Sequence, residues 1–177
     1  METNKTQDFL LKKQIRKEAM DRISLEYPLT AEMLKKYSDE LNWTKVSNNA
    51  SINWSIDMIK AFEYYIDWTE FSEFVSEKLL YDEVIDRFKD KWDWKALSNN
   101  RGLKLTYELL DRYIDRWDWS VIINRGEWNK REDIFSLEFL KRYQDRIPME
   151  ELENSELWMD IVEKEMDAIK KEMILTS

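Results

Sequence analysis

Hydrophobic and polar positions follow a unit of about 25 residues that recurs five times along this chain. Each copy contains two large apolar residues followed, three positions after the second of them, by an aromatic anchor. The anchors are Tyr37, Phe62, Phe88, Tyr113 and Tyr143, and their spacings are 25, 26, 25 and 30 residues. Self-similarity at a fixed period is the signature of a repeat array. We therefore expect stacked copies of one small structural unit.

The apolar spacing within each copy predicts an α-helix. In the third copy Val84, Ile85, Phe88 and Trp92 fall at i, i+1, i+4 and i+8, on one face of a helix, and the other copies repeat this spacing. Hydroxyl residues that can cap the helix precede it in four copies: Thr30, Ser55, Thr106 and Ser136. Tyr81 takes this place in the third copy, so we expect the cap there to shift to Asp82.

A shorter second helix is expected to begin six residues after each anchor. Its first residues are Trp43, Trp68, Trp94 and Trp119, with Met149 in the fifth copy. The residues before the tryptophans are predicted N-caps: Asn42, Asp67, Asp93 and Asp118. Four asparagines at a fixed offset are predicted to end the helices in the left-handed conformation: Asn48, Asn99, Asn124 and Asn154. A unit this small cannot bury its own apolar face, so each tryptophan should pack between neighbouring copies.

These patterns predict an all-α fold, a short helical-repeat solenoid of five two-helix units in a single domain. The repeats span residues 29–154. A capping helix is expected within residues 1–28, where an apolar stripe should cover the first copy: Leu11, Ile15, Ala19 and Ile23. A second capping helix, with an acidic outer face, is expected within residues 155–177. The chain has only two glycines and two prolines, which favours helices joined by short connections.

Three stretches of the chain resemble a degenerate helical repeat found in many uncharacterised bacterial, bacteriophage and giant-virus proteins. They are LTAEMLKKYSDELNWTKVS, VIDRFKDKWDWKALSNN and LTYELLDRYIDRWDWSVI. The likeness covers about residues 29–154. It brings no established activity, substrate or catalytic residue. It implies a viral or mobile-element setting, in which small binders and inhibitors are common.

Composition and charge argue against several kinds of partner. The formal net charge is -9, of which residues 148–177 carry -6 through nine acidic and three basic side chains. The remaining -3 is too close to neutral for the basic stripe that nucleic-acid binding requires. The chain contains no cysteine, no signal-like opening and no apolar stretch of bilayer length. We therefore expect a cytoplasmic protein without a nucleic-acid or membrane partner.

The residue types that most catalytic sites need are missing. There is no histidine or cysteine, and two glycines are too few for a phosphate-binding loop. The recurring carboxylates have a structural explanation, since each lies three residues after a cation, the spacing of a helix ion pair. The pairs are Lys36 with Asp39, Arg87 with Asp90, Arg112 with Asp115 and Arg142 with Asp145. We therefore predict no enzymatic activity, no cofactor and no metal.

Candidate partner-binding residues are those that break the repeat. The second copy adds Tyr64, Tyr65 and Phe74 outside the shared stripe, and the longer connection before the fifth copy contains Arg125, Trp128, Lys130 and Arg131. Insertions in repeat arrays often map to the binding face, and aromatic residues and arginine are typical of interface hot spots. The alternative is a tolerated loop in which Trp128 folds back onto the core.

The sequence predicts a non-enzymatic protein that binds another protein. In its concrete form this is a phage or mobile-element inhibitor or adaptor that binds a bacterial defence or nucleic-acid-processing protein. One alternative is a structural role in a larger assembly, with a homo-oligomer possible. The other is an acidic mimic of nucleic acid formed by Glu150, Glu151, Glu153, Glu156, Asp160 and Glu163. The simpler interpretation of these residues is a solvated helix face.

Overall fold

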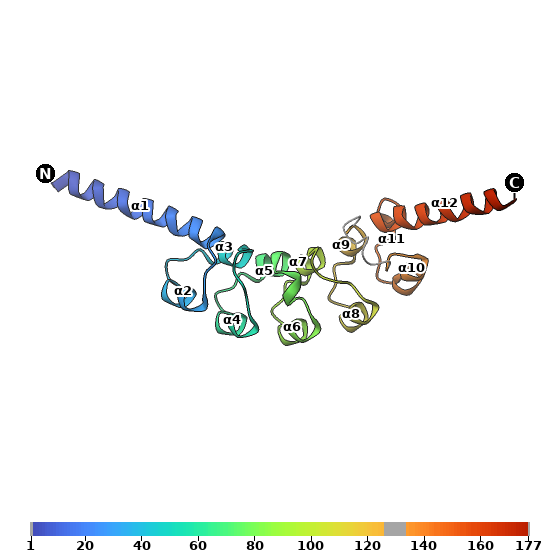
Figure 1. The fold of residues 1–177 in the computed structure, drawn as a ribbon, viewed down its shortest axis with the longest axis horizontal. Coiled ribbons are helices and arrows are strands. Elements are labelled where there is room, and N and C mark those ends of the chain that lie inside the picture. Colours follow the sequence, from blue (N-terminus) through green and yellow to red (C-terminus); the bar gives the residue numbers. More distant parts are fainter. Residues whose placement is uncertain (1, 126–133, 177) are drawn as a thin grey trace. The chain divides into compact units, whose positions relative to one another are not determined.

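The computed structural model describes residues 2–125 and 134–176, with side chains described from residue 7 to residue 175 of these ranges. Within them every regular element is a helix and no strand occurs, which confirms the predicted all-α class (Figure 1). The chain divides into two compact units, Met1–Asp93 and Trp94–Ser177. The division falls inside the third copy, between its two helices.

The first unit begins with a long helix and continues with short ones. Its elements are α1 (Glu2–Glu26), α2 (Ala31–Lys36), α3 (Trp43–Asn48), α4 (Ile56–Ala61), α5 (Trp68–Phe74), the 3-10 turn η1 (Glu77–Leu79) and α6 (Asp82–Arg87). Helices α2, α4 and α6 follow one another along one side of this unit, while α3 and α5 lie on the other side (Figure 1). Helix α3 packs against both α1 and α5.

The second unit has the same alternation and ends in a long helix. Its elements are α7 (Trp94–Asn99), α8 (Tyr107–Arg112), α9 (Trp119–Ile123), α10 (Leu137–Tyr143), α11 (Met149–Leu152) and α12 (Glu156–Thr176). Helix α7 packs against α9 as α3 packs against α5. The core of each unit is formed by the apolar stripe of the first helices and by the inward residues of the second helices, including Phe71 and Ile122, which are fully buried.

Seven of the predicted helix caps are present in the structure. Each hydroxyl accepts from the backbone N–H three residues later, at 3.3 Å for Thr30, 3.2 Å for Ser55, 3.1 Å for Thr106 and 3.3 Å for Ser136. Asn42, Asp67 and Asp118 cap the second helices in the same way. The expected shift to Asp82 is wrong, because α6 begins at Asp82 itself and Tyr81 holds the cap position without a side-chain bond.

Two of the four asparagines, Asn48 and Asn124, do not adopt the left-handed conformation that was predicted for the ends of the second helices. Asn124 has φ -108° and ψ 12°, and Asn48 is the last helical residue of α3. The next residue, Asn49, leaves the helix with φ -75° and ψ 102°, an extended conformation. The prediction is wrong because the chain runs directly into the connection to the next copy, and the side chain of Asn49 takes part in that junction.

The recurring tryptophans join neighbouring copies, as predicted. The indole Nε1 of Trp43 donates to the carbonyl of Ser38 at 2.9 Å, and Trp68 and Trp119 form the same bond five residues back. This bond closes the corner between the two helices of one copy. Each ring also lies against the next anchor, at centroid distances of 5.6 Å for Trp43–Phe62, 5.7 Å for Trp68–Phe88, 4.6 Å for Trp94–Tyr113 and 4.8 Å for Trp119–Tyr143.

Four helices, α1, α3, α5 and α7, each carry a buried serine at the junction with the following copy. The serine hydroxyl accepts from the backbone N–H of the following N-cap residue: Ser24 from Asn42 (3.0 Å), Ser47 from Asp67 (2.9 Å), Ser72 from Asp93 (3.0 Å) and Ser98 from Asp118 (3.0 Å). Three of these hydroxyls also donate to the carbonyl four residues earlier, at 2.6–2.7 Å. The serines therefore satisfy a backbone donor at each junction, a role that the sequence analysis did not assign.

The terminal helices differ from the predicted caps. Leu11 and Ile15 are 60% and 59% exposed, so the predicted stripe does not cover the first copy, and Ala19 and Ile23 are exposed as well. The residues of α1 that pack are Met20 and Ser24, which take the places of Trp43 and Ser47 in α3. In α12 only the first turns pack, since Leu157 is buried whereas residues from Val162 onward are exposed.

The ion pairs connect different partners from those predicted. Arg142 bonds to Asp111 on α8, and Arg146 Nη1 lies 2.5 Å from Asp115 Oδ1. Both pairs join the fourth copy to the fifth, so the i,i+3 pair of Arg142 with Asp145 is wrong. The same Asp111 carboxylate also accepts from the Tyr143 hydroxyl at 2.9 Å.

Candidate functional site

At one position of the repeat, the first and fourth copies have a polar side chain that binds backbone carbonyls of the preceding segment. This position is the sixth residue after the tryptophan, and we call its occupant the clamp residue. In the first copy the clamp residue is Asn49, which is buried. Its Nδ2 donates to the carbonyl of Ser24 at 3.0 Å and to that of Tyr27 at 2.9 Å. Its Oδ1 accepts from Ser51 N at 2.8 Å, so the carboxamide uses both of its ends.

The fourth copy fills the same position with an arginine. Arg125 Nη1 donates to the carbonyl of Ser98 at 3.3 Å, and Nη2 donates to those of Asn100 and Leu103 at 2.8 Å each. The side chain is only 7% exposed. Arg125 was predicted to face a partner, and the structure instead places it inside the second unit as a clamp residue. We therefore leave it out of any binding surface.

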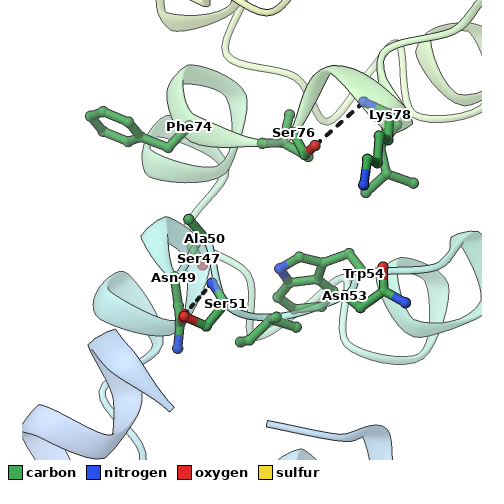
Figure 2. A pocket seen from close by; sticks show the side chains of 12 residues that line it. Ser47, Asn49, Ala50, Ser51, Asn53, Trp54, Phe74, Ser76 and Lys78 are labelled. Atoms are coloured by element: carbon green, nitrogen blue, oxygen red, sulfur yellow. Dashed lines mark hydrogen bonds between the residues drawn. The ribbon is translucent and has the colours of Figure 1, made fainter. Parts of the chain in front are cut away.

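The second copy has no polar clamp residue. Phe74 stands six residues after Trp68, and it is 48% exposed. Figure 2 shows its ring turned away from the other labelled side chains. A phenyl ring has no N–H to offer to carbonyl groups, so burying it against them would leave them without a donor. The position that is closed by an amide in the first copy is therefore open beside Phe74.

A cavity of about 580 Å³ lies where the clamp is missing. It separates the connection after α3 from the segment that joins α5 to η1 (Figure 2). We call it the clamp cavity, and it is lined by Ser47, Asn49, Ala50, Ser51, Ile52, Asn53, Trp54, Phe74, Val75, Ser76, Lys78 and Leu79. Ile52, Trp54, Val75 and Leu79 are buried and form an apolar floor, whereas Ser51, Asn53, Ser76 and Lys78 are exposed.

Two residues that line the cavity correspond to the two whose carbonyls Asn49 binds in the preceding junction. The carbonyls that Asn49 holds lie four and seven residues after Met20, and the corresponding residues after Trp43 are Ser47 and Ala50. Both line the cavity, and no described residue donates to either carbonyl. On the opposite wall Lys78 carries an ammonium group that has no carboxylate within ion-pair distance among the described residues.

A second opening lies at the start of the array, between α1 and α2. We call it the end groove, a hollow of about 340 Å³ that is lined by Arg16, Met20, Ile23, Tyr27, Leu29, Met33, Tyr37 and Leu41. Tyr37 is the one anchor that is only half-buried, since Phe62, Phe88, Tyr113 and Tyr143 are all buried. All five anchors lie in the described part of the chain. The first anchor is thus less covered than the others.

The incomplete coverage of Tyr37 has a structural cause. A covered anchor such as Tyr143 meets both helices of the preceding copy, through Trp119 on α9 (4.8 Å between ring centroids) and Tyr107 on α8 (6.2 Å). The end of α1 replaces the second helix of a preceding copy, with Met20 and Ser24 as its contacts. Within the described residues no first helix precedes α1, and the end groove is where that helix would pack.

A charged pair borders the end groove. Arg16 on α1 binds Glu40 after α2 through two hydrogen bonds, Nε to Oε2 at 2.6 Å and Nη2 to Oε1 at 3.0 Å. The guanidinium lowers the pKa of Glu40, and the carboxylate raises that of Arg16. Both side chains are more than 40% exposed, so the pair fixes the orientation of α1 more than it adds to stability.

Tyr64, Tyr65 and Phe74 have different surroundings in the structure. Tyr65 lies against Trp43, with 4.8 Å between ring centroids, and helps to cover the first copy. Tyr64 is 86% exposed, and the Lys91 ammonium lies 4.8 Å from its ring centroid. Among the described residues no ring contact joins either tyrosine to Phe74, which lines the clamp cavity. Trp128, Lys130 and Arg131 lie outside the described residues.

The acidic residues near the C-terminus lie on α11, on α12 and in the turn between them. Glu150, Glu151, Glu153 and Glu163 are exposed, and Glu156 and Asp160 are partly buried. In the part of the chain that the structure describes, no histidine, cysteine or carboxylate groups are clustered in a way that would hold a metal ion. In the same residues, none of the helices combines the length and the hydrophobicity needed to cross a bilayer.

The clamp position was not predicted from the sequence because it is occupied by Asn, Phe, Asn and Arg in four successive copies. The available signal was its constant offset from the tryptophan.

Protein-family models, curated proteins and solved structures were all compared with the chain, and none of them matches it.

Proposed function

We propose that this chain is a non-enzymatic binding module that recognises another protein by receiving an amphipathic helix of that protein in the end groove. The observation that supports this proposal is the half-buried Tyr37, the anchor that lacks the cover given to the other anchors. The groove continues the interface by which successive copies pack. Its apolar lining matches a helix with large apolar residues at i, i+1 and i+4, the pattern of the chain's own first helices.

A peptide of known sequence tests this proposal directly. Residues 80–93 contain α6 and its apolar stripe, so a labelled peptide of this sequence serves as the probe. We expect it to bind the full chain with a dissociation constant on the order of 100 µM, measured by fluorescence anisotropy. A control peptide with serine in place of Val84, Ile85 and Phe88 should not bind.

Two variants of the full chain localise the binding. Tyr37→Glu places a charge in the end groove and should abolish binding of the α6 peptide. Tyr64→Glu is the matched control, because Tyr64 is almost fully exposed and lies outside the groove. Equal binding to both variants, or equal binding of the serine peptide, contradicts the proposal. A concentration-dependent dimer that Tyr37→Glu dissociates would assign the groove to a second copy and would also contradict it.

In a narrower form of this proposal, the partner belongs to a bacterial defence or nucleic-acid-processing system. Only the resemblance of residues 29–154 to the degenerate helical repeat supports this form. Tagged chain expressed in bacteria should then retain such a protein, and Tyr37→Glu should release it while Tyr64→Glu does not. A retained protein that is indifferent to Tyr37 contradicts this form of the proposal.

Self-assembly is a second candidate function, supported by the exposed face of α12. Met159, Val162, Met166 and Ile169 are all 43–50% exposed, and their spacing of three, four and three residues is that of a coiled-coil seam. On this seam Glu165 and Lys170 occupy positions that face each other in a parallel pair, which favours a second copy as the occupant. Light scattering should then show a dimer that Ile169→Asp dissociates. A monomer at all concentrations contradicts it.

A further inference from the structure

We propose that the clamp cavity is a binding site for a primary carboxamide, the group found at the end of Asn and Gln side chains. The ligand would take the place in the second copy that Asn49 takes in the first. This inference is independent of the end groove, because the two openings share no lining residue.

Two residues that line the cavity have backbone carbonyls that a donor with two N–H groups could bridge. No described residue donates to the carbonyls of Ser47 and Ala50. The corresponding carbonyls in the preceding junction are bridged by one amide nitrogen, which lies 3.0 Å from Ser24 O and 2.9 Å from Tyr27 O. The NH₂ group of a primary carboxamide has the same two donors in one plane, so it can bridge Ser47 and Ala50 in the same way.

Lys78, on the opposite wall of the cavity, favours an acceptor and disfavours a cation. The Lys78 ammonium lines the cavity without a carboxylate partner among the described residues, and it can donate to the carboxamide oxygen. A guanidinium, which serves as the clamp in Arg125, would meet this ammonium as a like charge. A carboxylate would attract the Lys78 ammonium but offers no N–H group to the carbonyls. The carboxamide alone among these three groups satisfies both walls.

The size and floor of the cavity fit a side chain that carries this group. The volume of about 580 Å³ exceeds what one amide fills. Ile52, Trp54 and Val75 give the floor an apolar surface on which methylene groups can pack. The same chemistry can come from a free small amide or from an Asn or Gln side chain of a peptide, and the experiment separates these sources.

Nuclear magnetic resonance of the full chain, titrated with three probes of matched shape, tests the donor requirement. Propionamide should shift the backbone amide signals of Ser51, Ile52 and Ser76, with a dissociation constant on the order of 10 mM. Propionate lacks the N–H donors, and N,N-dimethylpropionamide has them blocked, so both should bind at least about 10-fold more weakly. Equal shifts with all three probes overturn the proposal, as does the absence of shifts with propionamide.

Two substitutions at one exposed position provide the matched control. Phe74→Asn supplies the missing carboxamide from the chain itself and should abolish the propionamide shifts. Phe74→Ala leaves the cavity open and should keep them. Because Phe74 is exposed, both variants should fold, and circular dichroism checks this. If propionamide shifts the signals of Phe74→Asn as strongly as those of Phe74→Ala, the cavity is not the site and the proposal is overturned.

Lys78→Met tests the acceptor requirement. It should weaken propionamide binding several-fold and remove the discrimination against a methylguanidinium probe. Unchanged affinities for both probes would overturn the assignment of Lys78.

A capped Gly-Gln-Gly peptide with an N-methylamide end identifies the source of the carboxamide. Binding at least about 10-fold tighter than propionamide supports a peptide side chain as the ligand, because the larger probe fills more of the cavity. Binding no tighter than propionamide supports a free small amide. A Gly-Glu-Gly peptide that binds as well as the glutamine peptide overturns the carboxamide assignment.

Discussion

The junction between α3 and α5 in the first unit and the junction between α7 and α9 in the second unit use the same parts except one. In both, a buried serine accepts from the next N-cap residue, at 2.9 Å for Ser47 and 3.0 Å for Ser98. Both also bury a large apolar residue three positions after the tryptophan. Only the clamp position differs, since Arg125 closes the second junction whereas Phe74 leaves the first one open. The copies therefore pack without a clamp, and its loss creates a cavity.

The packing of the recurring tryptophans against the next copy should make the largest single contribution to the free energy of unfolding. Trp119→Ala removes a ring that lies against Tyr143. The same ring closes the corner between α8 and α9 through its Nε1 hydrogen bond. We expect the substitution to lower the free energy of unfolding by about 3–5 kcal/mol in urea denaturation, because a large buried side chain leaves a cavity. Tyr64→Ala, at an exposed position, should change it by less than about 0.5 kcal/mol. Similar costs for the two variants would show that the tryptophan is not structural.

The clamp position should then separate the two junctions. Arg125→Ala leaves three carbonyls without their side-chain donor, so we expect a loss of about 2–3 kcal/mol. Phe74→Ala at the equivalent position should cost less than about 0.5 kcal/mol, since its ring is exposed and touches no carbonyl clamp. Urea denaturation of the two variants measures both values. Equal losses would remove the distinction between a closed and an open junction.

The serine link should have the same effect in both junctions. Ser47→Ala and Ser98→Ala each leave a backbone N–H without its acceptor, of Asp67 in one case and Asp118 in the other. We expect each to cost about 1–2 kcal/mol in urea denaturation. Ser51→Ala is the exposed control and should have little effect. If Ser98→Ala lowered the free energy of unfolding and Ser47→Ala did not, the junction beside Phe74 would lack the serine contact as well as the clamp.

Lowering the pH should reduce the stability that the Asp111 carboxylate contributes to the second unit. The Arg142 guanidinium, aided by the Tyr143 hydroxyl, lowers the pKa of Asp111 below its ordinary value of 3.8. A carboxylate whose pKa is lowered on folding adds stability above its ordinary pKa, and this stability is lost as the pH falls through the folded value. Asp111→Asn should therefore reduce the fall in the urea midpoint between pH 5 and pH 2.5. An unchanged pH profile would contradict the pairing.

The sequence predicted the regular parts of this fold because they repeat. Apolar spacing located the helices, hydroxyl residues located their starts, and the constant offset of the tryptophans from the anchors indicated packing between copies. The stripe of Leu11 and Ile15 selected the wrong face of α1, since Met20 and Ser24 have the same four-residue spacing. Spacing alone does not decide which of two faces packs.

The candidate site could not be predicted in the same way, because it arises where a contact is missing. Asn49, Phe74 and Arg125 share an offset but no residue type, and their common role is visible only when the carbonyls they face are known. Arg125 in particular was assigned to a binding surface because arginine is frequent in interfaces. Its guanidinium instead satisfies carbonyls of the preceding copy, a partner that lies 22–27 residues away in sequence.

The most direct test of this account is a crystal structure of the Phe74→Asn variant. We expect the introduced carboxamide to fold into the clamp cavity, with its nitrogen about 3.0 Å from the carbonyls of Ser47 and Ala50, as Asn49 lies against Ser24 and Tyr27. The cavity would then be closed. An introduced side chain that points into solvent, with both carbonyls still without a donor from the chain, would contradict the clamp as a shared feature of the repeat.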